Sequence, residues 1–346
     1  MTLEVDIEKR AGDFHLRTAF SCEREWLGIL GPSGCGKSMT LRCVAGLEKP
    51  DRGRIVLNGR VLFDSERGID LPPQKRRVGY LFQNYALFPG MSVRQNILCG
   101  LHAERDRKRR EARAEEIMAL LQLRDIADLR PEALSGGQAQ RTALGRILVN
   151  APDLLMLDEP FSALDTHLRL RLQMELRRLL SDYSGGILLV THDRDEAFRM
   201  CDRLGVMERG RMLAVKPTRE LFANPETVAA ALLTGCKNIA PAQKTGEREV
   251  CVPEWNVRLT VGQPVRENLV AVGIRAHDFR PEVPDNRFPV RILREMEEPF
   301  AWVSEFCYDG RANDAALWWR YPRELRPKEL PEALGVLPEN VLLLYK

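Results

Sequence analysis

The chain has 346 residues, a length that predicts two domains of ordinary size. Its 52 lysines and arginines nearly balance 49 aspartates and glutamates, which argues against a broad basic surface for nucleic acid and against an acidic disordered chain. No apolar run reaches the roughly 18 residues that span a bilayer, and the first residues lack the apolar core of a signal peptide. The eight cysteines form no CxxC pair, which is typical of a reducing compartment.

The first part of the chain alternates between predicted strands and helices. Short apolar runs predict strands at Trp26–Leu30, Val78–Phe82, Leu154–Leu157 and Gly186–Thr191. Helices are expected at Ser38–Gly46 and Thr166–Leu180. This α/β alternation predicts a mostly parallel sheet covered on both faces. Residues 84–150 are mainly helical and are predicted to form a subdomain inserted between two strands of the sheet.

The remainder of the chain has a different pattern. Four of the five tryptophans lie there, and its apolar runs are short and separated by proline and glycine. The runs are Val270–Ile274, Val290–Leu293, Ala301–Phe306 and Val341–Tyr345. Short, regularly separated runs predict a small β domain. We place the boundary near Thr234–Ala240, which gives domains of residues 1–235 and 236–346.

A glycine-rich segment, GPSGCGKS, follows the first predicted strand and opens a helix. Glycines allow backbone N–H groups to turn toward a phosphate chain, and the helix N-terminus adds its positive dipole end. In such a P-loop Lys37 reaches the β- and γ-phosphates, and the Ser38 hydroxyl is a ligand of Mg²⁺. The predicted nucleotide-binding residues are Gly31, Pro32, Ser33, Gly34, Cys35, Gly36, Lys37, Ser38 and Met39.

Two acidic residues end the apolar run at Leu154–Leu157. A strand that ends in two acids places carboxylates at the carboxyl edge of the sheet, where ligands bind. We expect Asp158 to hold Mg²⁺, directly or through water, and Glu159 to polarise a water beside the γ-phosphate.

The segment LSGGQ opens a predicted helix between these two motifs. Its free N–H groups, hydroxyl and helix N-terminus form a second predicted anion site, made by Ser135, Gly136, Gly137 and Gln138. One nucleotide does not need two such helix ends from the same chain. We therefore expect this site to serve the nucleotide of another subunit.

With these motifs, residues 1–235 resemble the nucleotide-binding domain of ABC transporters, whose signature is LSGGQ. The resemblance implies that Gln83 is the Q-loop glutamine, a ligand of Mg²⁺ and water that reports to the membrane partner. It implies that Asp165, in Ser162–Asp165, belongs to the D-loop, and that His192 is the switch histidine that contacts the γ-phosphate. Phe14 is the candidate for the family's adenine-stacking aromatic residue.

Further segments look like ATPases of solute importers: residues 61–64, 71–77 and 85–89. Residues 236–346 look like the small β domains, similar to oligonucleotide/oligosaccharide-binding folds, that such ATPases carry. Residues 61–70 and 234–239 most resemble the ATPases for molybdate, with those for sulfate next. The resemblance implies that the chain hydrolyses ATP with Mg²⁺ and that this hydrolysis powers the import of a solute. Among the solutes, it favours molybdate. Import of sulfate or thiosulfate, iron, polyamines or sugars is the alternative.

The same resemblance implies a set of partners. A second copy of the chain would sandwich two ATP molecules, and a membrane permease would dock on the region after Gln83 at the cytoplasmic face of the membrane. A solute-binding protein would take part indirectly. Three roles stay open for the C-terminal domain, namely binding an oxyanion, binding a regulatory protein and strengthening the dimer.

Other classes of protein fit the sequence less well. No nucleic-acid partner is expected, and the basic run at Arg105–Arg113 is interpreted as the solvated face of a helix because acidic residues interrupt it. A P-loop kinase or GTPase would lack LSGGQ. A non-transport ABC ATPase acting on DNA or ribosomes usually carries two cassettes or a long coiled-coil insertion.

Overall fold

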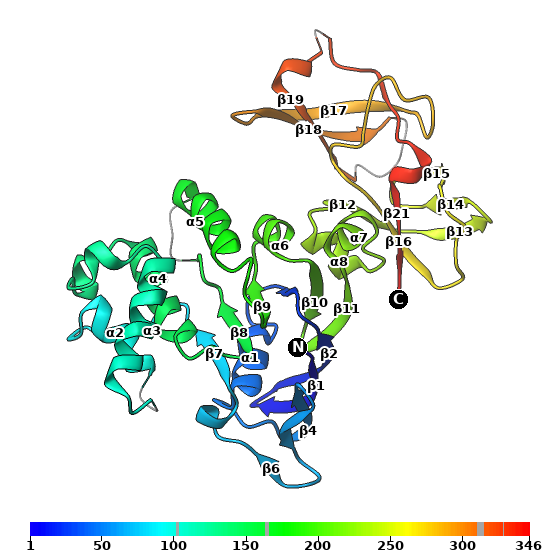
Figure 1. The fold of residues 1–346 in the computed structure, drawn as a ribbon. Coiled ribbons are helices and arrows are strands. Elements are labelled where there is room, and N and C mark those ends of the chain that lie inside the picture. Colours follow the sequence, from blue (N-terminus) through cyan, green and yellow to red (C-terminus); the bar gives the residue numbers. More distant parts are fainter. Residues whose placement is uncertain (102–103, 163–165, 310–314, 328) are drawn as a thin grey trace. The chain divides into compact units, whose positions relative to one another are not determined.

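The computed structural model describes residues 1–101, 104–162, 166–309, 315–327 and 329–346 (Figure 1). The chain forms two compact units, Met1–Thr218 and Arg219–Lys346. This division falls earlier than the boundary expected at 235/236. The reason is that helix α8 (Val228–Leu233) packs with the strands that follow it: Ala231 lies in one buried cluster with Ala271 and Leu344.

Five adjacent strands of the first unit run parallel; four of them carry the expected apolar runs, and β10 was not predicted. In spatial order they are β10 (Arg203–Glu208), β3 (Trp26–Leu30), β9 (Gly186–Thr191), β8 (Leu154–Asp158) and β7 (Val78–Leu81). Every residue of β3 and β9 is buried, as expected for strands covered on both faces. The carboxyl ends of these strands therefore share one edge.

The rest of this sheet is largely antiparallel, which the sequence analysis did not predict. Its strands are β1 (Leu3–Ala11), β2 (Phe14–Cys22), β4 (Arg52–Leu57), β5 (Arg60–Asp64), β6 (Ile69–Asp70) and β11 (Arg211–Pro217). They pair as β6–β5–β4–β1–β2 and β11–β10, so the sheet is mixed. Asn58 and Gly59, both at positive φ, make the tight turn between β4 and β5.

Helices cover the parallel strands. Helix α1 (Lys37–Ala45) buries Leu41 and Val44 in one cluster with Met156 of β8 and Val190 of β9. Full burial of each such side chain contributes about 1.5–3 kcal/mol. Helix α6 (Arg194–Met200) contacts β3 and β9, and helix α5 (Thr166–Leu179) contacts α6.

The predicted helical subdomain lies between β7 and β8. It contains α2 (Val93–Gly100), α3 (Arg107–Leu120) and α4 (Gly136–Leu148), grouped together in Figure 1. Gly145 of α4 packs closely, because a Cβ there would lie 3.1 Å from side-chain atoms of Ile97 and Leu121. The close approach of α4 to α2 holds the subdomain together.

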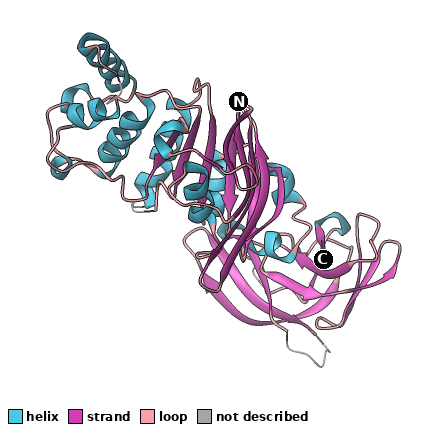
Figure 2. Ribbon diagram, turned by 90° about the horizontal axis from the view of Figure 1, so that it is seen from below, coloured by secondary structure: helices cyan, strands magenta, loops and turns pink. Residues whose placement is uncertain are grey.

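The second unit is built mainly of strands, which dominate the region around the C-terminus in Figure 2. Its described strands form three small sheets, β12–β16–β21, β13–β14–β15 and β19–β18–β17–β20. The strands are β12 (Asn238–Pro241), β13 (Gln243–Gly246), β14 (Glu249–Val252), β15 (Val257–Thr260), β16 (Leu269–Ile274), β17 (Phe288–Glu297), β18 (Ala301–Tyr308), β19 (Leu317–Pro322), β20 (Ala333–Leu334) and β21 (Val341–Tyr345).

One apolar core joins these sheets. Phe279 and Phe306 meet edge to face in it, with ring centroids 5.1 Å apart. The small C-terminal β domain expected from the sequence is thereby confirmed, and its curled sheets fit an oligonucleotide/oligosaccharide-binding-like fold. Helix α7 (Thr218–Ala223) leads into it.

Candidate nucleotide-binding site

The P-loop connects β3 to α1 and closes around the side chain of Lys37. Gly34 and Gly36 adopt left-handed φ angles of 78° and 106°, which favour glycine. The buried Lys37 Nζ donates hydrogen bonds to the carbonyl oxygens of Gly31 (2.8 Å) and Pro32 (3.0 Å). A Cβ on Gly31 would lie 2.3 Å from the Met207 carbonyl oxygen. The loop therefore presents a fixed ammonium group and backbone N–H groups at the start of α1.

Two of the three predicted Mg²⁺ ligands lie together at this point. The Ser38 hydroxyl donates to Asp158 Oδ1 at 2.7 Å, and the Tyr80 hydroxyl donates to Asp158 Oδ2, also at 2.7 Å. Hydroxyl and carboxylate oxygens are the hard ligands that Mg²⁺ prefers, so this donor set fits the ion. The third predicted ligand, Gln83, has a different partner: its Nε2 donates to Ser162 Oγ at 3.0 Å.

Glu159 and His192 face each other at the ends of neighbouring strands. Glu159 follows β8 and His192 follows β9, and the distance from His192 Nδ1 to Glu159 Oε2 is 3.2 Å. Glu159 has φ 45°, so it turns sharply out of its strand, at a cost of about 1–3 kcal/mol for a residue with a side chain. Its N–H donates to the Val190 carbonyl at 3.0 Å, which ties this turn to β9.

The turn after Glu159 is held from two other directions. Tyr85 Oη and Gln140 Nε2 both donate to the Pro160 carbonyl oxygen, at 3.2 Å each. Ser162 Oγ donates back to the Glu159 carbonyl at 3.0 Å. The segment after Gln83 and helix α4 therefore both touch the turn that carries Glu159. Asp165, the predicted D-loop residue, lies outside the described residues.

The LSGGQ segment forms the N-terminus of α4. Ser135 caps the helix: its Oγ accepts from Gln138 N at 3.3 Å, while Ser135 N donates to Gln138 Oε1 at 2.9 Å. Ser135 and Gly136 are exposed, and Gly137 is buried against Leu172. Among the described residues, no hydrogen bond joins this helix end to the P-loop of the same chain. In this structure the hydrogen bonds of Ser135 and Gln138 cap their own helix.

A hollow of about 480 Å³ borders the P-loop. Its lining includes Phe14, His15, Arg209 and Arg211, with the P-loop residues 32–35 along one side. A Cβ on Gly36 would lie 3.1 Å from Phe14 Cζ, so this ring lies against the loop. The sequence analysis named Phe14 but not the other three side chains, which β2 and the β10–β11 turn bring here. Cys35 is buried in the core cluster beneath the loop, and burial raises the pKa of its thiol.

Comparison with known proteins establishes the family. A family model described as ABC transporter matches residues 19–162. The spermidine/putrescine import ATP-binding protein PotA of Bacillus cereus is 42% identical over 245 residues, covering 70% of this chain and 72% of that protein. This chain belongs to the ATP-binding subunits of ABC importers. The protein of the same name from Nitratidesulfovibrio vulgaris is 43% identical over 239 residues, covering 69% of this chain and 60% of that protein.

Solved structures similar to the importer subunit support the same assignment. A dimeric structure of the bacterial ABC transporter cassette MJ0796 has a TM-score of 0.53 and 27% identity, covering 63% of this chain and 99% of that one. For cbiO1 of Clostridium perfringens the TM-score is 0.57 and the identity 29%, covering 65% of this chain and 91% of that one. One structure of MJ0796 is a post-hydrolysis state bound to ADP and Pi.

The importer subunit is accordingly an ATPase, and the predictions of its fold, of ATP binding and of ATP hydrolysis are confirmed. Such ATPases use Mg²⁺, and the oxygens of Ser38 and Asp158, 2.7 Å apart, are a donor set that fits this ion. No helix in the described ranges is both long and apolar enough to cross a membrane. The prediction of molybdate as the solute gains no support from these relatives, which are named for spermidine and putrescine.

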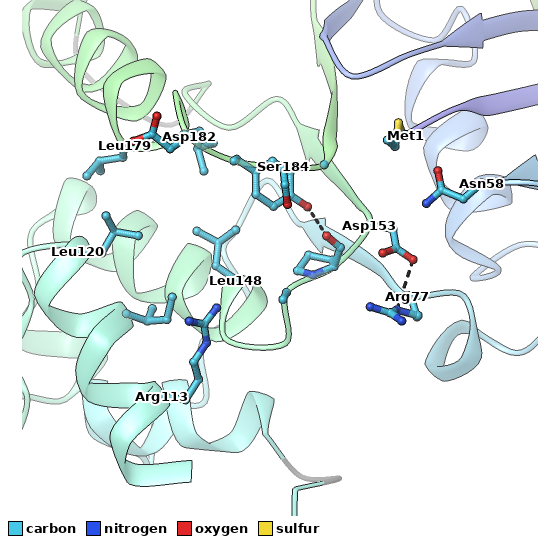
Figure 3. A pocket seen from close by; sticks show the side chains of 16 residues that line it. Met1, Asn58, Arg77, Arg113, Leu120, Leu148, Asp153, Leu179, Asp182 and Ser184 are labelled. Carbon is cyan, nitrogen blue, oxygen red and sulfur yellow. Dashed lines mark hydrogen bonds and ion pairs between the residues drawn. The ribbon is translucent and has the colours of Figure 1, made fainter. Parts of the chain in front are cut away.

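A second hollow lies away from the ATP site in the importer subunit. It measures about 680 Å³, and Figure 3 shows Leu120 of α3 and Leu179 of α5 on one side of it and Met1 and Asn58 on the other. Asp153 and Ser184, which precede β8 and β9, line it, and Arg77 pairs with Asp153 at 3.3 Å. It therefore borders the amino ends of the parallel strands, whereas Asp158, Glu159 and His192 are at their carboxyl ends.

Proposed function

We propose that this subunit powers the import of a polyamine of the spermidine/putrescine class. The observation that carries the proposal is the identity of 42–43% with two ATP-binding proteins named for that activity. The ATPase of an importer does not touch the solute, so its own site residues do not select between polyamines and oxyanions. The names of the relatives favour the polyamine alternative over molybdate.

The geometry supports hydrolysis in which each residue has a distinct role. Lys37 Nζ exchanges its bonds to the loop carbonyls for phosphate oxygens of ATP. Ser38 and Asp158 would hold Mg²⁺, and the bound ion would supply positive charge beside the phosphates. Glu159 accepts a proton from the attacking water. His192, whose Nδ1 lies 3.2 Å from Glu159 Oε2, orients this water. Gln83 donates a hydrogen bond to Ser162, which lies in the turn after Glu159, and so connects the Q-loop to that turn.

A second copy of the chain completes the site in this proposal. Ser135 and Gly137 of the second copy would cover the phosphates that Lys37 and Ser38 of the first copy hold. Two features support this arrangement: the exposed position of Ser135, and the lack of any described hydrogen bond from LSGGQ to its own P-loop. The dimeric state of the similar cassette MJ0796 supports it as well.

We place the permease on the surface that follows Gln83. Phe88 is 45% exposed and Met91 is 36% exposed, while Tyr85 and Leu87 are partly buried. A short amphipathic helix of a permease fits such an apolar surface and would keep the subunit on the cytoplasmic face of the membrane. The solute-binding protein would act on the far side of the permease. An oxyanion at the C-terminal domain stays a prediction.

Uptake measurements test the solute. Cells that lack this gene are supplied with the wild-type chain or with Glu159→Gln, and uptake of labelled spermidine, putrescine and molybdate is followed. Restored uptake of a polyamine by the wild-type chain alone is the expected result. Restored uptake of molybdate with no change for polyamines would overturn the proposed solute and would leave the ATPase assignment in place.

A further inference from the structure

The carboxylate of Asp158 is held on both of its oxygens. Ser38 Oγ donates to Oδ1 and Tyr80 Oη donates to Oδ2, each at 2.7 Å. Asp158 belongs to β8 and Tyr80 to the adjacent parallel strand β7, in which Tyr80 is the register partner of Met156. Because Met156 and Asp158 are two residues apart, their side chains lie on the same face of the sheet, within reach of a long tyrosine.

The hydroxyl of Tyr80 acts as a hydrogen-bond donor at physiological pH. A tyrosine hydroxyl is ordinarily protonated at neutral pH, and here it donates its proton to Asp158 Oδ2. Arg42 of α1 also interacts with this hydroxyl. The ring of Tyr80 lies against Phe82, with centroids 4.6 Å apart. The side chain is therefore fixed by packing on one side and by polar groups on the other.

We propose that Tyr80 is a positioning residue for the magnesium site, which it serves by fixing the plane and rotamer of the Asp158 carboxylate. A carboxylate that rotates freely must be ordered when the ion binds, and a donor on its second oxygen supplies that order in advance. Ser38 gives its only proton to Oδ1, so its lone pairs stay available for the ion. Loss of such a supporting hydrogen bond typically weakens metal affinity about 10–100-fold.

Tyr80 also connects the magnesium site to the Q-loop, through its hydrogen bond to Asp158 and the backbone of residues 80–83. Gln83 lies three residues after Tyr80 and contacts Ser162, in the turn that follows Glu159. A displacement of the segment after Gln83 would therefore act on Asp158 through β7 as well as on Glu159 through the turn. This role rests on the use of Mg²⁺ with ATP and is independent of the solute proposed above.

The test compares Tyr80→Phe with the wild-type chain in a binding assay that needs no turnover. Mg²⁺ is titrated into protein with a fluorescent, non-hydrolysable ATP analogue, and the Mg²⁺ midpoint is read from the fluorescence. We expect the midpoint to rise about tenfold or more. The affinity for the nucleotide without Mg²⁺, and kcat at saturating Mg²⁺, should change less than about threefold.

Two further variants keep the result interpretable. Tyr183→Phe removes another half-buried tyrosine hydroxyl, which donates to the Pro152 carbonyl at 2.6 Å near the opposite ends of the strands. It should leave the Mg²⁺ midpoint unchanged. Tyr80→Met also removes the hydroxyl and should shift the midpoint as Tyr80→Phe does. An unshifted midpoint in folded Tyr80→Phe, or an equal shift in Tyr183→Phe, would overturn the role of Tyr80.

Discussion

Glu196 is a carboxyl group buried four residues after His192. Only 3% of the residue is exposed, and its Oε1 has no hydrogen-bond partner among the described residues. Burial, followed by the negative charge of Asp193, raises the pKa of Glu196 to about 8. The folded chain therefore favours the protonated carboxyl at neutral pH.

The pH dependence of stability follows from this shift. The folded state holds a proton on Glu196 up to about pH 8, whereas the unfolded chain releases it near its ordinary pKa of 4.5. Stability from this group is therefore greatest below about pH 4.5 and is lost as the pH rises toward 8. Glu196→Gln should remove this dependence, which urea unfolding at pH 5, 7 and 9 would measure. Parallel pH profiles for both proteins would contradict the prediction.

The segment after Gln83 is held in an unusual conformation by helix α4. Tyr85 and Ala86 both have positive φ, 59° and 46°, which is costly for residues with side chains. Arg146 of α4 donates to both of their carbonyl oxygens, at 3.0 Å and 2.7 Å, and its guanidinium lies 5.2 Å from the centre of the Phe88 ring. Arg146 therefore holds the strained turn of Tyr85 and Ala86 against helix α4, which begins with the LSGGQ segment.

Arg146→Lys should loosen this turn. A lysine keeps the charge but lacks the planar fork that binds two carbonyls at once. We expect hydrogen exchange in residues 84–90 to become several-fold faster, and solute stimulation of the assembled transporter to fall several-fold. Basal ATPase activity should change little. Arg113→Lys, on α3 of the same subdomain and paired with Glu116, is the matched control. Unchanged exchange in residues 84–90 would refute the role of Arg146.

Elements differ in how far the sequence predicts them. The strands β3, β8 and β9 follow from continuous apolar runs, because both of their faces are covered. Strand β1 alternates buried Leu3, Val5 and Ile7 with charged residues, so a search for continuous apolar runs does not predict it. The P-loop is contiguous in sequence, so its residues were predictable. The contact between Tyr80 and Asp158 spans 78 residues and depends on strand register, which no local pattern reveals.

At the scale of the whole molecule, each chain supplies one P-loop and one LSGGQ segment. If ATP joins the P-loop of one copy to Ser135 of another, a chain that binds ATP without hydrolysing it accumulates as a dimer. Glu159→Gln removes the carboxylate that we propose as the proton acceptor and preserves the shape of the side chain. We expect this variant to bind ATP normally, to hydrolyse it at least about 100-fold more slowly, and to elute as a dimer with ATP and Mg²⁺ in light-scattering chromatography.

A second substitution shows whether the dimer forms through the signature segment. Ser135→Arg, added to Glu159→Gln, places a bulky side chain at an exposed position that has no hydrogen bond to its own P-loop. Loss of the serine cap costs about 1 kcal/mol, which leaves the fold intact. The double variant should bind ATP like the single one and stay monomeric. A monomeric Glu159→Gln at saturating ATP and Mg²⁺ would contradict the sandwich, and a dimer that survives Ser135→Arg would place its interface elsewhere.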